Sequence, residues 1–116
     1  MEYFLAQFYE LYLDQGTDFN HIISFTDDLS GNLINVSGYT LSAQAKKSYY
    51  SPNIYITFAC TINDATNGNI SMSIDSANSA NIPGGNYVFD LKGSTPTNKK
   101  IRIAEGTIIV TPQVTI

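Results

Sequence analysis

The sequence contains one histidine, His21, and one cysteine, Cys60, which could in principle form a nucleophile and its base. A cysteine thiolate needs an activating partner, and no flanking motif supports this pair. His21 stands in the alternating row Phe19, His21, Ile23, where a hydrogen-bonded structural histidine is the expected role. Cys60 stands in a similar row, in which a lone cysteine is usually a small buried hydrophobic residue. We therefore predict structural roles for both residues.

Residues 63–69, NDATNGN, are the nearest approach to a calcium-binding loop. If Gly68 is aligned with the invariant glycine of an EF-hand loop, Ala65 falls at the third position and Ile74 falls where a bidentate glutamate belongs. The segment therefore fails as a calcium loop. We predict instead a β-hairpin turn built on Asn67-Gly68.

The acidic residues do not indicate a pair of catalytic carboxylates. Sugar hydrolysis needs two acids about 5–10 Å apart across a cleft, and the acids of this chain mostly mark turns or solvent-facing positions. The GxSxG motif of serine hydrolases is also missing from the sequence. We expect a protein with no enzymatic activity, no metal and no cofactor.

The composition indicates one domain with a neutral polar surface. The chain has 116 residues, only 14% of them charged, and a net charge of −4. We expect the densest basic stretch, residues 99–102, to be a solvent-exposed segment beside a β-hairpin turn, and we interpret Lys46-Lys47 in the same way. Without a basic stripe we expect no nucleic-acid partner. The apolar start, residues 1–14, has neither the basic region of a signal peptide nor the length of a membrane span, so we expect no membrane partner.

Alternation with a period of two dominates the chain and predicts half-buried strands. Each alternating row is bounded by Gly, Pro, Asn, Asp or Ser. About seven strands fit a two-layer, antiparallel, immunoglobulin-like β-sandwich, and residues 75–80 fit a single helical turn between the layers. The predicted strands lie within residues 8–14, 19–25, 39–45, 54–62, 70–74, 87–91 and 101–110.

The segment NIPGGNYVFD, residues 81–90, predicts how the penultimate strand begins. In immunoglobulin-like sandwiches a tyrosine stands two residues before a core position of that strand, and its hydroxyl bonds back to the preceding loop. Pro83 and Gly84 would form the corner, Tyr87 would be the corner tyrosine, and Phe89 would take the core position. The alternative is that Tyr87 is simply an aromatic residue at the edge of the core.

The order of several short motifs resembles a family of small virion structural proteins of tailed bacteriophages, of the type found in marine cyanobacterial phages. The chain is similar more distantly to the N-terminal domain of phage baseplate upper proteins. The resemblance covers roughly residues 9–115 in collinear order. The motifs are LDQGTDF at 13–19, VSGYT at 36–40, QAKKSYY at 44–50, IPGGNYVFDL at 82–91 and EGTIIVTPQVT at 105–115.

This resemblance implies an immunoglobulin-like domain that is built into a virion during assembly in the host bacterial cytoplasm. Its partners would be other virion structural proteins, namely capsid, neck or tail subunits, contacted in multiple symmetric copies. The family has no catalytic residues to transfer to this chain. Capsid decoration or cement, neck, tail and baseplate all remain open as positions in the particle.

The first eight residues extend beyond the resemblance and are rich in aromatic side chains. We hypothesise that residues 1–8 form an arm, ahead of a single domain over 9–116, and that Tyr3, Phe4 and Phe8 contact a neighbouring subunit. The alternative is that residues 3–13 form one long first strand of the same domain.

Eight tyrosines and several Asn/Ser-rich loops suggest a second function, the binding of a host-surface glycan by an adhesion module on the virion. Tyr49-Tyr50 and Tyr55 would then supply a stacking platform. The alternative is that these tyrosines pack on strand faces or in loops, as amphipathic aromatic residues commonly do.

Overall fold

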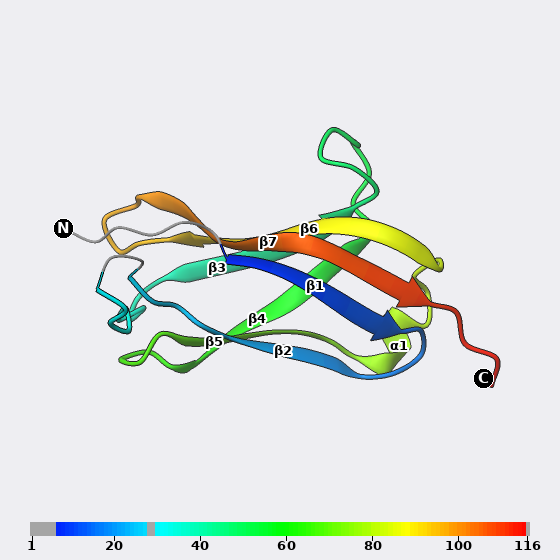
Figure 1. Ribbon diagram of the computed structural model, residues 1–116, viewed down its shortest axis with the longest axis horizontal. Helices are drawn as coiled ribbons and strands as arrows, with labels where there is room; N and C mark the ends of the chain where they lie inside the picture. Colours follow the sequence, from blue (N-terminus) through cyan, green and yellow to red (C-terminus); the bar gives the residue numbers. More distant parts are fainter. Residues whose placement is uncertain (1–6, 28–29, 116) are drawn as a thin grey trace.

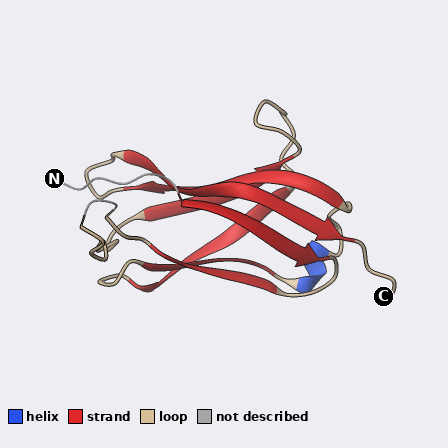
Figure 2. Ribbon diagram, viewed as in Figure 1, coloured by secondary structure: helices blue, strands red, loops and turns tan. Residues whose placement is uncertain are grey.

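The computed structural model of the protein describes residues 7–27 and 30–115, which are mostly β-structure. The rows predicted as strands are found as strands, and the predicted helical turn is found as a short helix (Figures 1 and 2). The all-β prediction is therefore confirmed. In chain order the elements are β1 (Gln7–Asp14), β2 (Phe19–Ser24), β3 (Thr40–Lys46), β4 (Ile56–Asp64), β5 (Asn69–Ile74), α1 (Ser76–Ser79), β6 (Gly85–Ser94) and β7 (Lys100–Thr111).

The strands form one sheet in the order β1-β7-β6-β3-β4-β5-β2, and β4 folds that sheet into two layers. Residues 56–58 of β4 pair with β3, whereas residues 59–64 pair with β5. Figure 1 shows β1, β7, β6 and β3 in one layer and β5 and β2 in the other, with β4 crossing between them. The shared strand therefore lets a continuous sheet cover both sides of one core.

The prediction of a purely antiparallel arrangement was wrong for one pair of strands. β1 runs parallel to β7, with Gln7 opposite Ala104 and Asp14 opposite Thr111. The other five pairings among the described strands are antiparallel. Alternation could not reveal this, because the period of two is the same whichever way a neighbouring strand runs.

The core lies between the two layers and consists of the inward-facing residue of each alternating pair. Tyr87, Phe25 and Phe89 are among its largest fully buried side chains. The connection between β2 and β3 also reaches into it, through Ile34 and Val36. The buried strand residues form the rest of a single cluster, which includes Leu11, Leu13, Ile23, Ala43, Ala45, Ile56, Phe58, Ile70, Met72, Leu91, Ile103, Ile108 and Val110.

The turn between β4 and β5 closes one end of the core. It spans residues 65–68, and Gly68 has a positive φ of 65°, so the predicted hairpin is present with a four-residue loop. A Cβ at Gly68 would lie 2.5 Å from the carbonyl oxygen of Ile34 and 2.7 Å from that of Phe25. Only glycine allows the connection between β2 and β3 to pack this closely against the turn.

At the opposite end of the core, α1 lies in the connection from β5 to β6 and is hydrogen-bonded to the turn between β1 and β2. The Asp75 side chain caps the helix by accepting from the backbone N–H of Asn78 at 2.9 Å. The buried Ser79 hydroxyl donates to the Thr17 carbonyl at 2.7 Å and accepts from the backbone N–H of Gly16 at 3.1 Å. Across residues 7–27 and 30–115, no helix is long and apolar enough to span a bilayer.

The two end strands of the sheet, β1 and β2, come together along one side of the molecule (Figure 1). The ring centroids of Tyr9 on β1 and His21 on β2 are 4.6 Å apart, with an edge-to-face geometry. This contact nearly closes the sheet into a barrel. We call the strip between β1 and β2 the seam.

Gly106 of β7 is the position at which β1 approaches most closely. It pairs with Tyr9 on one side and with Phe89 on the other. A Cβ built on Gly106 would lie 1.8 Å from the Tyr9 carbonyl oxygen, and the φ of Gly106 is 156°. The parallel pairing of β1 with β7 therefore requires glycine here.

We expect Gly106→Ala to lower the free energy of unfolding by about 3 kcal/mol. The added methyl group must displace the β1 backbone, and alanine at this φ also strains the β7 backbone. Thermal and urea unfolding followed by circular dichroism would measure this loss. Gly31→Ala is the control, since Gly31 also has a positive φ but a Cβ added there would meet no atom within 4 Å. The control should lose only about 1 kcal/mol. Equal losses in the two variants would contradict the steric argument.

Candidate functional site

The predicted contact residues at the start of the chain fall in two groups. Tyr3 and Phe4 lie outside the described residues. Phe8 is the second residue of β1 and points to the outer face of the sheet, where 67% of its surface is exposed. The docking of Phe8 on a neighbouring subunit stays a prediction.

The outer face of β1 carries a second exposed aromatic residue, Tyr12, four positions after Phe8. Tyr12 is 63% exposed and stands opposite Ile109 of β7. Its hydroxyl donates to the Glu10 carboxylate at 2.9 Å, and Glu10 raises the pKa of the Tyr12 phenol. We call Phe8, Tyr12 and Ile109 the β1 strip. It lies beside an edge whose outer backbone groups pair with no other described strand.

The corner before β6 has the hydrogen bond predicted for it. The buried Tyr87 hydroxyl donates to the carbonyl oxygen of Pro83, four residues earlier. Gly84 lies between them, close to Pro112, where a Cβ would come within 2.6 Å of the proline ring. Phe89 is buried at the expected core position. The back-bonded corner tyrosine agrees with the first of the two interpretations of Tyr87.

The same corner is covered by Lys47 and Tyr55. The Tyr55 and Tyr87 ring centroids are 5.5 Å apart, and the Lys47 ammonium lies 4.1 Å from the Tyr87 ring centroid. A cation this close to a ring face is attracted by its quadrupole. Lys47 is therefore held against the corner and is not simply a solvated residue.

The three tyrosines expected to form a stacking platform have different surroundings. Tyr50 is 98% exposed. Tyr55 packs on Tyr87 and lines a hollow that also includes Asn78 and Ile82. Tyr49 is 54% exposed and lines a different hollow, on the outer face of β3 and β6. Of the three, Tyr49 is the one that borders a charged recess.

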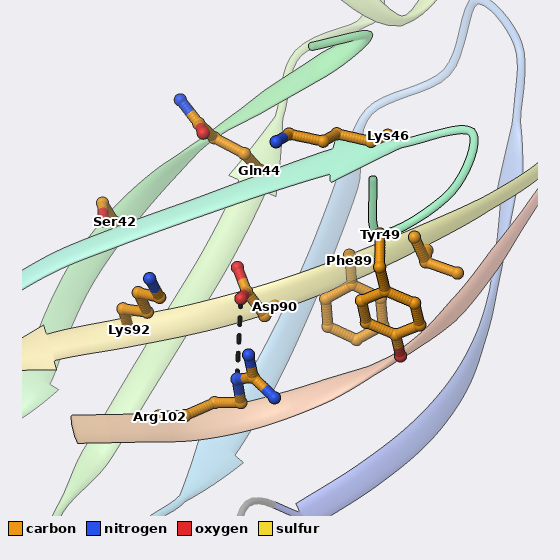
Figure 3. A pocket seen from close by; sticks show the side chains of 9 residues that line it. Ser42, Gln44, Lys46, Tyr49, Phe89, Asp90, Lys92 and Arg102 are labelled. Carbon is orange, nitrogen blue, oxygen red and sulfur yellow. Dashed lines mark ion pairs between the residues drawn. The ribbon is translucent and has the colours of Figure 1, made fainter. Parts of the chain in front are cut away.

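This recess, which we call the outer-face hollow, has a volume of about 390 Å³. β3 forms one side, β6 the floor and β7 the other side, while Tyr49 from the β3–β4 connection stands at one end (Figure 3). The volume falls within the usual range for small-molecule sites, about 300–1,000 Å³. Its lining residues are Ser42, Gln44, Lys46, Tyr49, Val88, Phe89, Asp90, Lys92 and Arg102.

An irregularity in β7 brings Arg102 to this face. Leu91 of β6 pairs with Ala104, but the next residue, Lys92, pairs with Arg102, so one residue of β7 is extra. Ile103 and Ala104 are consequently both buried. Because such a bulge shifts the alternation by one residue, Arg102 and Glu105 share the outer face although they are three positions apart.

The charged groups of the hollow are only partly neutralised. The Arg102 Nε lies 3.6 Å from an Asp90 carboxylate oxygen, and its Nη1 lies 3.7 Å from one of Glu105 (Figure 3 shows the Asp90 pair). Lys46 and Lys92 make no ion pair with any residue in the described part of the chain. The hollow therefore presents two uncompensated ammonium groups next to an ion-paired arginine.

The histidine considered at the outset lies at the seam, whereas the cysteine lies two strands away on β4, so the structure does not pair them. His21 of β2 and Cys60 of β4 both stand opposite Met72, which lies on the strand between them. Burial raises the pKa of the Cys60 thiol, which opposes formation of a thiolate. This placement agrees with structural roles for both residues.

One detail of the His21 prediction was wrong. Its buried Nε2 makes no hydrogen bond to the described residues, so it is not a hydrogen-bonded structural histidine at this atom. The ring is held instead by its edge-to-face contact with Tyr9, whose hydroxyl donates to Gln7. Burial lowers the pKa of His21, because the charged form loses hydration without gaining an acceptor.

Acidic, histidine and cysteine side chains do not gather in groups of three that could hold a metal ion within residues 7–27 and 30–115. The outer-face hollow is the recess in this part of the chain that combines basic residues from three strands. Three of its charged residues, Asp90, Lys92 and Arg102, come from the two strands joined by the bulge.

No family model matches this chain, and no curated protein matches it. Among solved structures, the chain is similar to part of a family 123 glycoside hydrolase from Clostridium perfringens, studied for glycolipid glycan hydrolysis. The TM-score is 0.42 and the sequence identity 13%; the match covers 95% of this chain and 24% of that protein. A likeness this loose carries no argument about this chain.

Sequence reasoning missed the outer-face hollow. Residues 99–102 were interpreted as a solvent-exposed segment beside a β-hairpin turn, and the position of Arg102 opposite Lys92 depends on the bulge. The signal available was a conflict in alternation: Ile101 and Ile103 occupy odd positions, whereas Ile108 and Val110 occupy even ones. A change of phase within one strand indicates a bulge between the two halves.

We expect Tyr87→Phe to lower the free energy of unfolding by about 1.5 kcal/mol, because the Pro83 carbonyl loses its buried hydrogen-bond donor. Urea unfolding at neutral pH measures the change. Tyr50→Phe removes the same atom from a nearly fully exposed ring and should leave stability unaltered. If the two variants unfolded alike, the corner hydrogen bond would not be holding the entry to β6.

A second prediction concerns pH. Because the pKa of His21 is lowered in the folded state, the unfolded chain takes up this proton more readily as the pH falls below about 6.5. The His21 contribution to stability is therefore present above that pH and is lost below it. The urea midpoint of the wild type should fall more between pH 7 and pH 5 than that of His21→Phe. Parallel pH profiles for the two proteins would refute the assignment, since the carboxylates titrate in both.

Proposed function

We propose that this protein is a non-enzymatic structural subunit of a tailed bacteriophage virion, acting through protein–protein contacts. The observation that carries the proposal is the β1 strip, where Phe8 and Tyr12 are exposed on the outer face of an end strand. The ordered motifs over residues 9–115 resemble small virion proteins of tailed bacteriophages, and for this reason we propose a phage particle. The partners are capsid, neck or tail subunits, and the site of action is the virion.

We also infer that the domain is an immunoglobulin-like sandwich. In that fold the third, sixth and seventh strands form one sheet, while the second, fourth and fifth form part of the other. The order β7-β6-β3 and the order β4-β5-β2 agree with these two groups. The back-bonded Tyr87 before Phe89 is a further point of agreement. β1 departs from the simplest scheme, since it joins β7 and not β2.

The geometry of β1 suits repeated assembly contacts. The β1 edge faces β2 across the seam, so a neighbouring subunit would contact the outward-facing side chains of the β1 strip. Phe8 and Tyr12 stand one above the other on the outer face, with Glu10 between them. Aromatic anchors of this kind contribute most of the binding energy in many protein interfaces. In a symmetric particle the same contact is formed in every copy.

The double variant Phe8→Ser/Tyr12→Ser should fold normally but enter particles poorly. Each aromatic anchor contributes about 2 kcal/mol to an interface, so at least about tenfold fewer copies per particle are expected. Quantitative mass spectrometry of purified virions of the encoding phage, normalised to the major capsid protein, measures the copy number. Thermal unfolding establishes that the variant is folded.

Ile22→Ser is the matched control, because Ile22 is 56% exposed on β2, the other end strand. This variant should incorporate like the wild type. Absence of the wild-type chain from purified virions would overturn the proposal as a whole. Normal incorporation of the double variant would leave a virion protein whose contacts lie elsewhere than the β1 strip.

A further inference from the structure

The outer-face hollow concentrates positive charge on an acidic protein. Lys46, Lys92 and Arg102 are half of the six basic residues of the chain, whose net charge is −4. They come from β3, β6 and β7, and one carboxylate, Asp90, lies among them. Screening limits the potential of exposed charges to about 8 Å at physiological ionic strength, so an anion in the hollow responds to these cations, to Asp90 and to the adjacent Glu105, and not to acidic residues elsewhere on the chain.

The positions of the charges leave two donors available for a ligand. Asp90 and Glu105 both lie on the Arg102 guanidinium, at 3.6 and 3.7 Å. Lys46 and Lys92 have no such partner among the described residues. Each lysine ammonium can donate up to three hydrogen bonds, and those to a carboxylate are charge-assisted.

The remaining lining matches hydroxyl groups and an apolar ring face. Ser42 and Gln44 of β3 are exposed and can both donate and accept hydrogen bonds. They stand directly opposite Lys92 and Asp90 of β6 in the strand register. Tyr49 stands at one end of the hollow, while Ser42 and Lys92 lie toward the other (Figure 3).

We propose that this hollow binds an acidic saccharide, a sugar that bears a carboxylate. Lys92 binds the carboxylate, Ser42, Gln44 and Lys46 bind ring hydroxyls, and the exposed Tyr49 ring packs on the C–H face of the sugar. An acidic peptide would satisfy the same lysines and is therefore tested against the sugar below. This inference does not depend on the assembly role of β1.

This proposal assigns glycan binding to a different set of residues from the tyrosine platform predicted from the sequence. Tyr49 remains in it, whereas Tyr50 and Tyr55 do not line this recess. The charged strand face replaces them as the main binding surface. Selectivity for acidic over neutral sugars follows, because a neutral sugar would displace the water around the Lys92 ammonium without supplying a counter-charge.

The test is an NMR titration of the full-length chain with methyl α-D-galacturonide and, separately, with methyl α-D-galactoside, which lacks the carboxylate. The galacturonide should shift the amide signals of Gln44, Tyr49 and Lys92 and bind at least tenfold more tightly than the galactoside. Equal binding of the two sugars, or binding of neither, would overturn the proposal.

Two variants and their matched controls locate the site. Lys92→Gln should weaken galacturonide binding about tenfold, while Lys99→Gln, with the same charge change in the exposed β6–β7 connection, should have no effect. Tyr49→Ser should weaken it several-fold, and Tyr50→Ser should not. Thermal unfolding confirms that all four variants are folded.

Two further probes separate the sugar from its charge. If sodium acetate, or the peptide acetyl-Glu-Glu-Glu-amide, bound as tightly as the galacturonide, the hollow would be a general anion site and the saccharide assignment would be wrong. Weaker binding of both probes, together with loss of galacturonide binding in Lys92→Gln, supports the assignment.

Discussion

The whole architecture depends on one strand that pairs with both layers. β4 pairs with β3 through its first residues and with β5 through the rest, so a single seven-stranded sheet surrounds the core. Because the sheet turns back on itself, its end strands β1 and β2 meet at the seam, where Tyr9 contacts His21. The same turn leaves the outer faces of β3, β6 and β7 as one continuous surface. The hollow lies on that surface, and the β1 strip continues it onto the neighbouring outer face of β1.

Two local departures from regular β-structure shape the functional surface. Gly106 allows β1 to approach β7 in parallel, which places Phe8 and Tyr12 beside the sheet edge. The bulge at Ile103 and Ala104 turns Arg102 outward, into contact with Asp90. Both features lie in β7, which stands between β1 and β6 in the sheet. The proposed assembly surface and the proposed binding surface therefore adjoin the same strand. The two surfaces use opposite flanks of it: β1 on one side and β6 on the other.

Local signals in the sequence predicted the elements well because those elements depend on local chemistry. Alternating rows became strands, Gly68 formed the hairpin turn, and Tyr87 bonded back to Pro83, since each of these depends on residues close together in the chain. The His21 environment was predicted less well. Its expected hydrogen bond would need an acceptor from another strand, and the strand that reached it supplied the Tyr9 ring instead.

The sequence by itself determined which residues face the core and where the chain turns, because burial period and turn chemistry are encoded within a few neighbouring residues. Only the tertiary structure decided that β1 runs parallel to β7 and that Lys46, Lys92 and Arg102 share one hollow. The paired strands and the hollow join segments that are up to about a hundred residues apart in the sequence. Strand pairing and register bring these segments together, and no local pattern specifies either of them.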